Sequence, residues 1–460
     1  MRRLAIIGVL SACLLGGAPL SAMADEKTEK ALEERIKKLE KMVEVLTKHE
    51  ASEAKEEGKE KEKAAKAGEK PLSVGSTGSG KLVYAKPFVS APKATLGGYM
   101  DFEAAFFSGR QLTHSRITNF DQTRFIPFIY GDVTDRIKVA AEIEFEHAGT
   151  NNNKGDGEIK IEFATIDYLI TEPLNLRAGL LLMPVGKFNL LHDSPLNDLT
   201  DRPLVSRLII PSTWTEAGAG IYGTFYPTRL SKLDYELYAF NGFSDADTIA
   251  VGDGLRSSRG QEKTDNNNNK GVVGRVAFSP ILGVEVAGSA AHSAYNNAAR
   301  AVKDKKLTIW AVDWTLQRGP FELIGEAAWA RINDNFVGAT VGPAGMRGYY
   351  LQGNYHFLPE FLKKWAPKHF TDASTFTFVI RWDDVDTDTD DRTLTFLTGN
   401  TRELQRLTLG LNFRPIEDTV FKIDYQFNSQ LNTPVLNQSN LANFSPIDGN
   451  GWLFSVATYF

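Results

Sequence analysis

Charged side chains alternate with apolar ones through much of the sequence after residue 94. Between Ile137 and Phe145 every second residue is apolar, and Lys138, Glu142 and Glu144 lie between them. A two-residue period predicts a β-strand with one apolar and one charged face. Carboxylates and amines gathered on a water-facing surface attract or exclude ions, and that is the chemistry these residues offer.

The same alternation places further charged residues on the water-facing side of neighbouring runs. The acids are Asp101, Glu103, Glu142, Glu144, Glu236, Glu285, Glu322 and Glu326, and the bases are Lys138, Arg177, Arg275, Arg381, Arg414 and Lys422. With Glu146, Asp383 and Asp424 added, the acids outnumber the bases. Such a surplus of carboxylates favours cations. The alternative is that these charges only pair with one another in a wet interior.

Other chemical motifs are weaker. The stretch VGSTGSGKLV resembles a phosphate-binding loop, but Leu82 occupies the position that needs a hydroxyl group, so we interpret it as a Gly/Ser linker. A hydrolase would need a nucleophile beside a base, and His292 with Ser289 or Ser293 is the available combination. Nothing else selects it. We predict no enzyme activity, no cofactor and no metal site.

The N-terminal residues resemble an export signal. A short basic start, an apolar run and the Ala22-Met23-Ala24 cleavage pattern predict a signal peptide over residues 1–24. A lipoprotein signal ending at Cys13 and a membrane anchor are the alternatives. Cys13 is the only cysteine, so no intrachain disulfide is expected. The net charge of -5 is mild and argues against a nucleic-acid partner.

Two segments separate this signal from the alternating region. Apolar residues spaced four and three apart in residues 25–50 predict a short α-helical coiled coil, with a solvated charged helix as the alternative. Residues 51–93 are rich first in Lys, Glu and Ala and then in Gly, Ser and Pro, which is typical of a linker.

Residues 94–460 predict an all-β transmembrane barrel of about 16 antiparallel strands. Tight turns such as TEP and QRGP alternate with long polar loops, and a barrel needs no unpaired strand edge in lipid. A soluble β-sandwich is the competing fold. We expect the last strand, 451–460, to pair with the first strand near 98–107, and a bulge near Phe163 and Ala164, where the apolar phase switches.

Several segments of this region resemble the phosphate-selective porin O and P family. They are Arg177-Ala178-Gly179, Pro184-Val185-Gly186, Arg202 to Val205, Gly218 to Gly223, GYYLQGNYHF and TLGLNFRPIEDTVFKIDYQF. The resemblance implies a sixteen-stranded barrel, usually a homotrimer. It also implies a long loop, about Pro184 to Glu216, that folds into the lumen as a constriction. Its bases Lys187, His192, Arg202 and Arg207 would then form a local basic patch.

The expected function is an outer-membrane porin for passive diffusion of ions and small hydrophilic solutes. An anion- or phosphate-selective channel is one alternative, and a non-conducting anchor that reaches the cell wall through the coiled coil is another. Expected partners are outer-membrane lipid, lipopolysaccharide and the assembly machinery that reads a C-terminal aromatic residue. The N-terminal segment is expected in the periplasm.

Overall fold

The computed structural model describes residues 93–108, 117–147, 157–243, 249, 254–259, 265, 268–296, 304–337, 340–390, 403–431 and 449–460. The chain divides into two units, Met1–Ala91 and Pro92–Phe460, and every described residue lies in the second. The predicted signal peptide and coiled coil lie outside the described residues. So does the predicted linker, except for Lys93, which begins the first strand.

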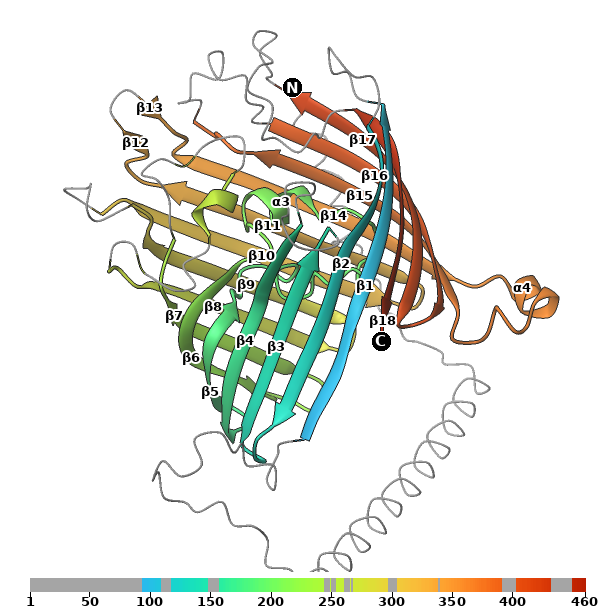
Figure 1. Ribbon diagram of the computed structural model, residues 1–460, viewed down its shortest axis with the longest axis horizontal. Coiled ribbons are helices and arrows are strands. Elements are labelled where there is room, and N and C mark those ends of the chain that lie inside the picture. Colours follow the sequence, from blue (N-terminus) through green and yellow to red (C-terminus); the bar gives the residue numbers. More distant parts are fainter. Residues whose placement is uncertain are drawn as a thin grey trace, which may run out of the picture. The chain divides into compact units, whose positions relative to one another are not determined.

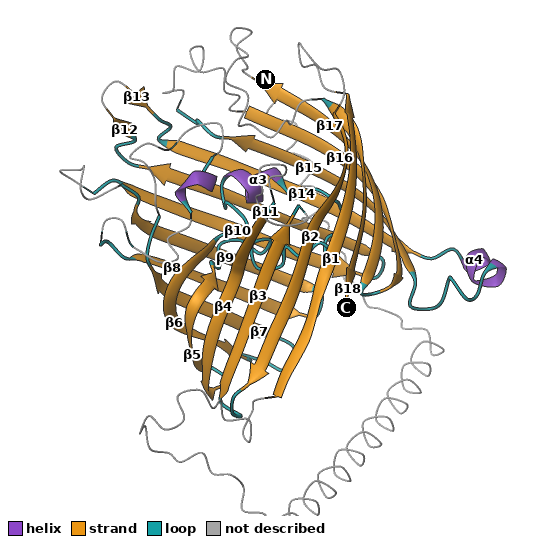
Figure 2. Cartoon of the chain, in the orientation of Figure 1, coloured by secondary structure: helices purple, strands orange, loops and turns teal. Residues whose placement is uncertain are grey.

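Sixteen strands of the described chain close into one antiparallel barrel, as predicted (Figure 1). Each strand pairs with its neighbours in sequence, with two exceptions: β1 pairs with β18, and β11 pairs with β14 because β12 and β13 form a separate hairpin. The strands are β1 Lys93–Ser108, β2 Ile117–Asp132, β3 Ile137–Glu146, β4 Glu158–Thr171, β5 Leu174–Leu182, β6 Thr215–Phe225, β7 Lys232–Phe240, β8 Gly271–Ile281, β9 Val284–Ala294, β10 Lys306–Arg318, β11 Phe321–Ile332, β12 Phe336–Val337, β13 Thr340–Val341, β14 Gly345–Phe357, β15 Thr375–Asp386, β16 Glu403–Ile416, β17 Thr419–Leu431 and β18 Asn450–Tyr459. Two short α-helices, α3 Leu204–Leu208 and α4 Glu360–Trp365, lie between strands (Figure 2).

The wall of the barrel has an apolar outside and a polar inside. In β16, Thr408 and Asn412 are buried, whereas Leu411 on the alternate face is exposed. In β15, Arg381 is buried and Ile380 beside it is exposed. Because successive side chains of a strand point to opposite faces, the alternation read from the sequence becomes a lipid-facing and an interior face.

The last strand closes the barrel against the first, as expected. β18 pairs with β1 from Tyr99 opposite Tyr459 to Ser108 opposite Asn450. Beyond the strand, Phe460 exchanges backbone hydrogen bonds of 3.0 and 3.1 Å with Gly98. The closure therefore extends to the final residue of the chain.

The expected bulge is present one residue from its predicted position. The β3–β4 pairing shifts between Glu142 opposite Phe163 and Ile143 opposite Ile161. Glu162 is therefore the extra residue of β4, and its side chain is buried. This bulge explains why the alternation of apolar residues changes phase here in the sequence.

The two ends of the barrel carry different connectors. Strand pairs such as β8–β9 and β16–β17 are joined by tight turns at one end. The connector between β14 and β15 lies at the same end but is long and contains α4. No helix in the described part of the chain is long and apolar enough to cross a membrane.

Candidate functional site

The connector between β5 and β6, residues 183–214, enters the barrel, and we call it the interior loop (Figure 1). Its entry depends on Gly186, which has a φ of +68° and donates its N–H to Ser289 Oγ at 3.0 Å. A β-carbon at this position would collide with the Glu326 carboxylate and would lie 2.8 Å from Ile210. Glycine is therefore required for the left-handed backbone and for the close approach to β11.

One side of the interior loop is apolar and packs against the wall. Met183, Val185, Val205, Ile209 and Trp214 belong to a buried cluster that also includes residues of β7 to β11, β14, β15 and β16. Burying these side chains stabilises the loop in the interior, at about 25 cal/mol for each Å² of apolar surface removed from water. The barrel thus contains a hydrophobic core on one side of its lumen.

Polar contacts attach the start and the helix of the loop to β9, β10 and β11. Lys187 Nζ lies 3.0 Å from a Glu285 carboxylate oxygen and 2.9 Å from Thr315 Oγ1. Ser206 in α3 donates a hydrogen bond of 2.7 Å to Glu326. These wall carboxylates hold the loop rather than facing open solvent.

The middle of the loop contacts β1, β2 and β4. Ser194 donates a hydrogen bond to Asp101, which also accepts one of 3.1 Å from Arg124 Nη1. His192 Nε2 lies 2.5 Å from Glu162 Oε1, and both side chains are buried. A buried carboxylate beside an imidazole is favourable only as a pair, because each group alone would lose its hydration.

The next part of the loop contacts β16 and β17, which adjoin β1 through β18. Asp198 Oδ1 lies 3.3 Å from Arg414 Nη2, and Asp201 Oδ2 lies 3.1 Å from Arg406 Nη1. Lys422 donates 2.8 Å and 3.3 Å hydrogen bonds to the carbonyl oxygens of Ser194 and Leu199. The interior loop therefore crosses the barrel, from β9, β10 and β11 on one side to β1, β17 and β16 on the other.

The electrostatics of Asp201 follow from these contacts. Burial acts to raise the pKa of Asp201, but the Arg406 guanidinium and the Gln426 amide outweigh it and hold the pKa below its ordinary value. The aspartate is therefore ionised when it binds Arg406.

The β7–β8 connector covers the end of the interior loop. Leu255 donates its N–H to the Leu208 carbonyl at 2.7 Å. Arg259 Nη1 donates to the carbonyl oxygens of Pro211 and Thr213 at 3.0 and 2.7 Å. The loop is thus fixed by the wall and by a second connector.

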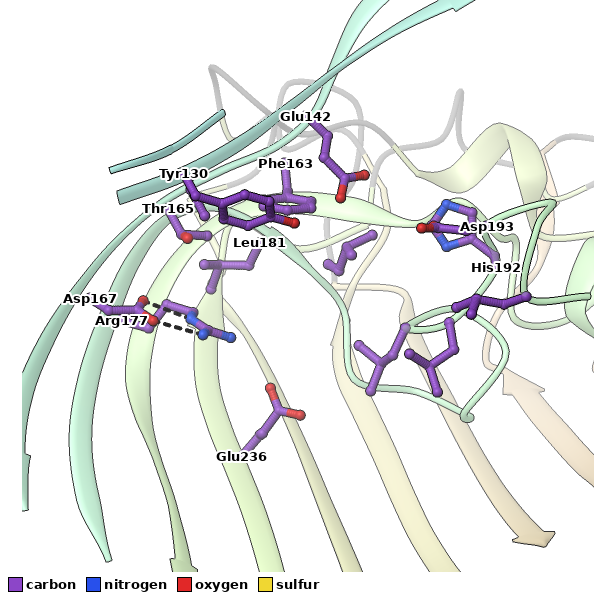
Figure 3. A pocket seen from close by; sticks show the side chains of 15 residues that line it. Tyr130, Glu142, Phe163, Thr165, Asp167, Arg177, Leu181, His192, Asp193 and Glu236 are labelled. Atoms are coloured by element: carbon purple, nitrogen blue, oxygen red, sulfur yellow. Dashed lines mark hydrogen bonds and ion pairs between the residues drawn. The ribbon is translucent and has the colours of Figure 1, made fainter. Parts of the chain in front are cut away.

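A cavity of about 450 Å³ remains between the interior loop and strands β2 to β7 (Figure 3). Its ionisable lining residues are Glu142, Asp167, Arg177, His192, Asp193 and Glu236. Arg177 forms a bidentate pair with Asp167, with both N–O distances 2.8 Å. Among these residues, carboxylates outnumber bases, and Arg177 is already neutralised by its partner.

The other acids of the cavity differ in their partners. Glu142 is 6% exposed and points toward the loop from β3 (Figure 3). Asp193 accepts a 2.9 Å hydrogen bond from the Tyr459 hydroxyl, and Glu236 accepts one of 2.7 Å from Tyr238. Burial raises the pKa of Asp193 above its ordinary value, although the adjacent His192 and the Tyr459 hydroxyl act to lower it.

The charged residues predicted for the interior separate into groups. Asp101, Glu285, Glu326, Arg381, Arg414 and Lys422 contact the interior loop. Glu144 pairs with Lys160 at 2.7 Å, Arg275 with Asp313 at 2.7 Å, and Glu322 accepts a 2.7 Å hydrogen bond from Asn354. Glu103 is half-buried in β1, and Lys138 pairs with Asp132 at the β2–β3 turn.

The loop bases do not gather as the expected basic patch. Lys187 binds Glu285 near β9, and His192 binds Glu162 on β4. Arg202 donates to Thr213 Oγ1 at 3.2 Å, and Arg207 makes no ion pair with any described residue. The loop's own aspartates, together with the wall carboxylates, offset these positive charges.

Several residues that organise the interior were not identified from the sequence. Glu162 lies at an irregularity in the strand phase, so its direction was ambiguous. Asp193, Asp198 and Asp201 stand in the segment HDSPLNDLTD, where their density is the signal that could have identified them. Arg406 is buried in the interior from β16, at a position that continues the same alternation.

The hydrolase arrangement considered from the sequence is not formed. His292 is exposed and its Nδ1 lies 2.7 Å from Thr308 Oγ1. Ser289 and Ser293 are buried, on the opposite face of β9. A serine on the other side of the strand cannot transfer its proton to this imidazole.

A closed sixteen-stranded barrel with an apolar exterior, a charged interior and a long connector inside it defines a porin-type outer-membrane barrel. The resemblance predicted from the sequence is confirmed: the model of the phosphate-selective porin O and P family matches residues 128–307. The matched segment runs from β2 to the start of β10 and covers less than half of the chain.

Three other proteins are similar to this chain in sequence or in fold. An uncharacterized protein of Aquifex aeolicus is 28% identical over 327 residues, which cover 66% of this chain and 70% of the relative. The outer membrane channel DcaP of Acinetobacter baumannii aligns with a TM-score of 0.50 and 12% identity, covering 80% of this chain and 98% of that one. An anion-selective porin from Comamonas acidovorans gives 0.51 and 11%, covering 80% and 100%. At these identities the solved structures support the fold.

Proposed function

We propose that this protein is a porin through which ions and small hydrophilic solutes diffuse passively, with the interior loop as its constriction. The supporting observation is the cavity of about 450 Å³ that the loop leaves beside β2 to β7. Elsewhere the loop packs against the wall through its apolar cluster and its ion pairs. Solutes would therefore pass on the β2 to β7 side.

The charge of this passage favours cations. Glu142, Asp193 and Glu236 line the cavity, and the guanidinium of Arg177 is bound by Asp167. Carboxylates lining a narrow aqueous path attract cations and repel anions. This lining supports a weakly cation-selective channel.

Two alternatives have support of their own. An anion- or phosphate-selective channel is suggested by the description of the matching family and by the related anion-selective porin. A non-conducting anchor is suggested by the number of contacts that hold the loop across the lumen. We favour conduction because the cavity is bordered by charged side chains and not filled by the apolar cluster.

The same proposal extends to the protein's surroundings. β1 begins at Lys93, which lies opposite Asp132 beside the short β2–β3 turn. Short turns of outer-membrane barrels face the periplasm, so we infer that β1 begins on that side, and we propose a periplasmic location for the N-terminal segment. A homotrimer, contacts with lipopolysaccharide, recognition of Phe460 by the assembly machinery and cell-wall binding remain proposals that rest on the sequence.

The first test is the reversal potential of the purified protein in a planar bilayer under a KCl gradient, followed by titration with phosphate. We expect a cation-selective potential and no block by phosphate. An anion-selective reversal potential, with conductance blocked by low concentrations of phosphate, would favour the anion- or phosphate-selective channel. Absence of conductance would favour the anchor.

A single substitution tests the assigned path. Glu142→Gln removes one carboxylate from the cavity and should lower the permeability ratio of potassium over chloride while the barrel still folds. Glu360→Gln makes the same chemical change in α4, outside the lumen, and should leave the ratio unchanged. Equal effects of both variants on the reversal potential would contradict a passage beside Glu142.

A further inference from the structure

The β14–β15 connector, residues 358–374, differs from the tight turns at the same end of the barrel. It contains α4, which stands out from the barrel wall (Figure 1). The turns between β8 and β9 and between β10 and β11 consist of only a few residues. Joining β14 to β15 does not require a connector of this length, so we looked for a second role in residues 358–374.

The helix exposes two large aromatic side chains. Phe361 is 67% exposed and Trp365 is 78% exposed. Because they are four residues apart in a helix, they lie on the same face. An exposed apolar face of this kind marks a surface that contacts another apolar phase.

The connector folds against the outside of the barrel. The Phe370 ring lies 6.2 Å from the Phe376 ring and 5.4 Å from the Phe413 ring, measured between centroids. Phe376 and Phe413 belong to the outer face, because Thr377 and Asn412 beside them are buried on the inner face. The end of the connector thus lies on the lipid-facing side of the wall.

An aromatic band continues from this contact along the outer face. The Phe376 ring is 5.8 Å from Phe357, which is 5.6 Å from Tyr355, and Tyr355 is 5.0 Å from Phe321. Bands of aromatic rings on barrels lie at the level of the lipid headgroups. The α4 connector joins this band through Phe370, so it leaves the barrel at that level.

The outer surface next to this band is also suited to lipid. A groove of about 790 Å³ is lined by Leu316, Leu323, Tyr355, Phe378 and Ile380. These residues include a member of the band and the outward side chains of β10, β11 and β15. Acyl chains would fill such a groove, while protein loops would bring polar backbone into it.

The charges of the connector complement a lipid surface. Lys363 is bound by Glu360 at 3.1 Å and by Asp372 at 2.9 Å, so the two acids are used within the connector. Lys364 and Lys368 are exposed and make no ion pair with any described residue. Lysines near a bilayer surface attract anionic headgroups.

We propose that the α4 connector is an interfacial membrane anchor. Phe361 and Trp365 enter the boundary between headgroups and acyl chains of the leaflet on the short-turn side, and Lys364 and Lys368 bind anionic phospholipid headgroups. This surface lies outside the lumen, so the inference does not depend on conduction or on ion selectivity.

The test uses the full mature protein in vesicles, with Cys13 replaced by serine if it is retained. Phe361→Cys and Trp365→Cys are each labelled with a nitroxide, and collision rates with oxygen and with a water-soluble nickel complex are compared by electron paramagnetic resonance. Asp372→Cys is the matched control in the same connector, because its side chain is 97% exposed and charged. Phe378→Cys on the outer wall gives the value for a lipid-facing site.

In vesicles containing phosphatidylglycerol, we expect the oxygen-to-nickel ratio at both aromatic positions to exceed that of Asp372→Cys several-fold and to approach that of Phe378→Cys. Lys364→Gln with Lys368→Gln should reduce this difference, and purely zwitterionic vesicles should do the same. A ratio equal to that of Asp372→Cys in every vesicle would overturn the proposal. Protection from both reagents would also overturn it, because a protein surface would then cover the helix.

As a measurement with the native residue in place, quenching by lipids brominated on the acyl chain is compared between the unchanged protein and Trp365→Phe. The unchanged protein should show the additional quenched fluorescence of Trp365. Identical quenching of the two proteins would place Trp365 in water and would contradict the anchor.

Discussion

At the scale of single residues, the pair of His192 and Glu162 shows how the interior loop is fixed. Both side chains are buried, and their polar atoms are 2.5 Å apart. The other ring nitrogen of His192 lies 3.0 Å from the Asn189 carbonyl oxygen, which orients the imidazole. Neither group has free access to water, so each depends on the other for its charge or hydrogen bond.

His192→Ala should therefore leave the buried Glu162 carboxylate without its imidazole partner. We expect the free energy of unfolding to fall by about 3–5 kcal/mol, measured by urea unfolding in lipid vesicles. His192→Ala combined with Glu162→Ala should recover part of this loss, because no isolated carboxylate remains. A loss below about 1 kcal/mol for the single variant would show that water reaches Glu162.

At the scale of elements, the interior loop behaves as an amphipathic plug on one side of the lumen. Its apolar residues join the buried cluster, and its aspartates bind bases on β16. The two aspartates Asp193 and Asp201 respond differently to acid, because burial dominates at Asp193 and Arg406 dominates at Asp201.

These opposite shifts predict two stages on acidification. Asp193, whose pKa is raised above its ordinary value, becomes neutral before Asp201 as the pH falls, so cation selectivity should weaken first. Asp201, whose pKa is lowered below 3.8, contributes stability above its unfolded-state pKa and loses it only as pH falls through the lower folded-state value. As the pH is lowered, the interior loop should therefore detach from the wall only after cation selectivity has been lost.

Reversal potentials and single-channel conductance, recorded as the pH is lowered, test this order. Asp193→Asn should remove most of the change in selectivity seen above the lower transition. A conductance increase that precedes the change in selectivity would contradict the assignment, because the loop would then leave before Asp193 had titrated.

At the scale of the whole molecule, one strand pairing decides whether the barrel closes. β1 and β18 are the two ends of the barrel chain, and Phe460 continues their contact to Gly98. The Phe460 ring also stacks on Phe125, with centroids 5.8 Å apart. A β-carbon at Gly98 would collide with the Ile126 carbonyl oxygen and would lie 2.8 Å from the Phe460 ring.

Gly98→Ala should therefore weaken closure, by about 1–3 kcal/mol as is typical of overpacking. The measurement is the fraction of protein that keeps its compact electrophoretic mobility in detergent after refolding into vesicles. Gly288→Ala is the matched control, because a β-carbon there would meet nothing within 4 Å. Equal folded fractions for the two variants would show that the seam tolerates the extra methyl group.

The strands, their faces and the closing pair could be predicted from the sequence because they depend on local alternation. Successive residues of a strand point to opposite sides of the wall, so the direction of Lys138 or Arg381 is set by its own strand. The bulge at Glu162 interrupts this alternation, since one extra residue reverses which face the residues beyond it point to.

The contents of the barrel were decided only by tertiary structure. Asp201 meets Arg406, and Lys422 meets Ser194, across separations of more than two hundred residues that no local pattern relates. The position of the aromatic face of α4 likewise depends on a tertiary contact, because Phe370 packs against Phe413 on the outer wall. The sequence by itself determined a closed barrel with a charged interior, because backbone pairing and burial repeat every two residues. The folded chain decided which charges bind the loop and which remain beside the cavity, because that depends on where distant segments meet.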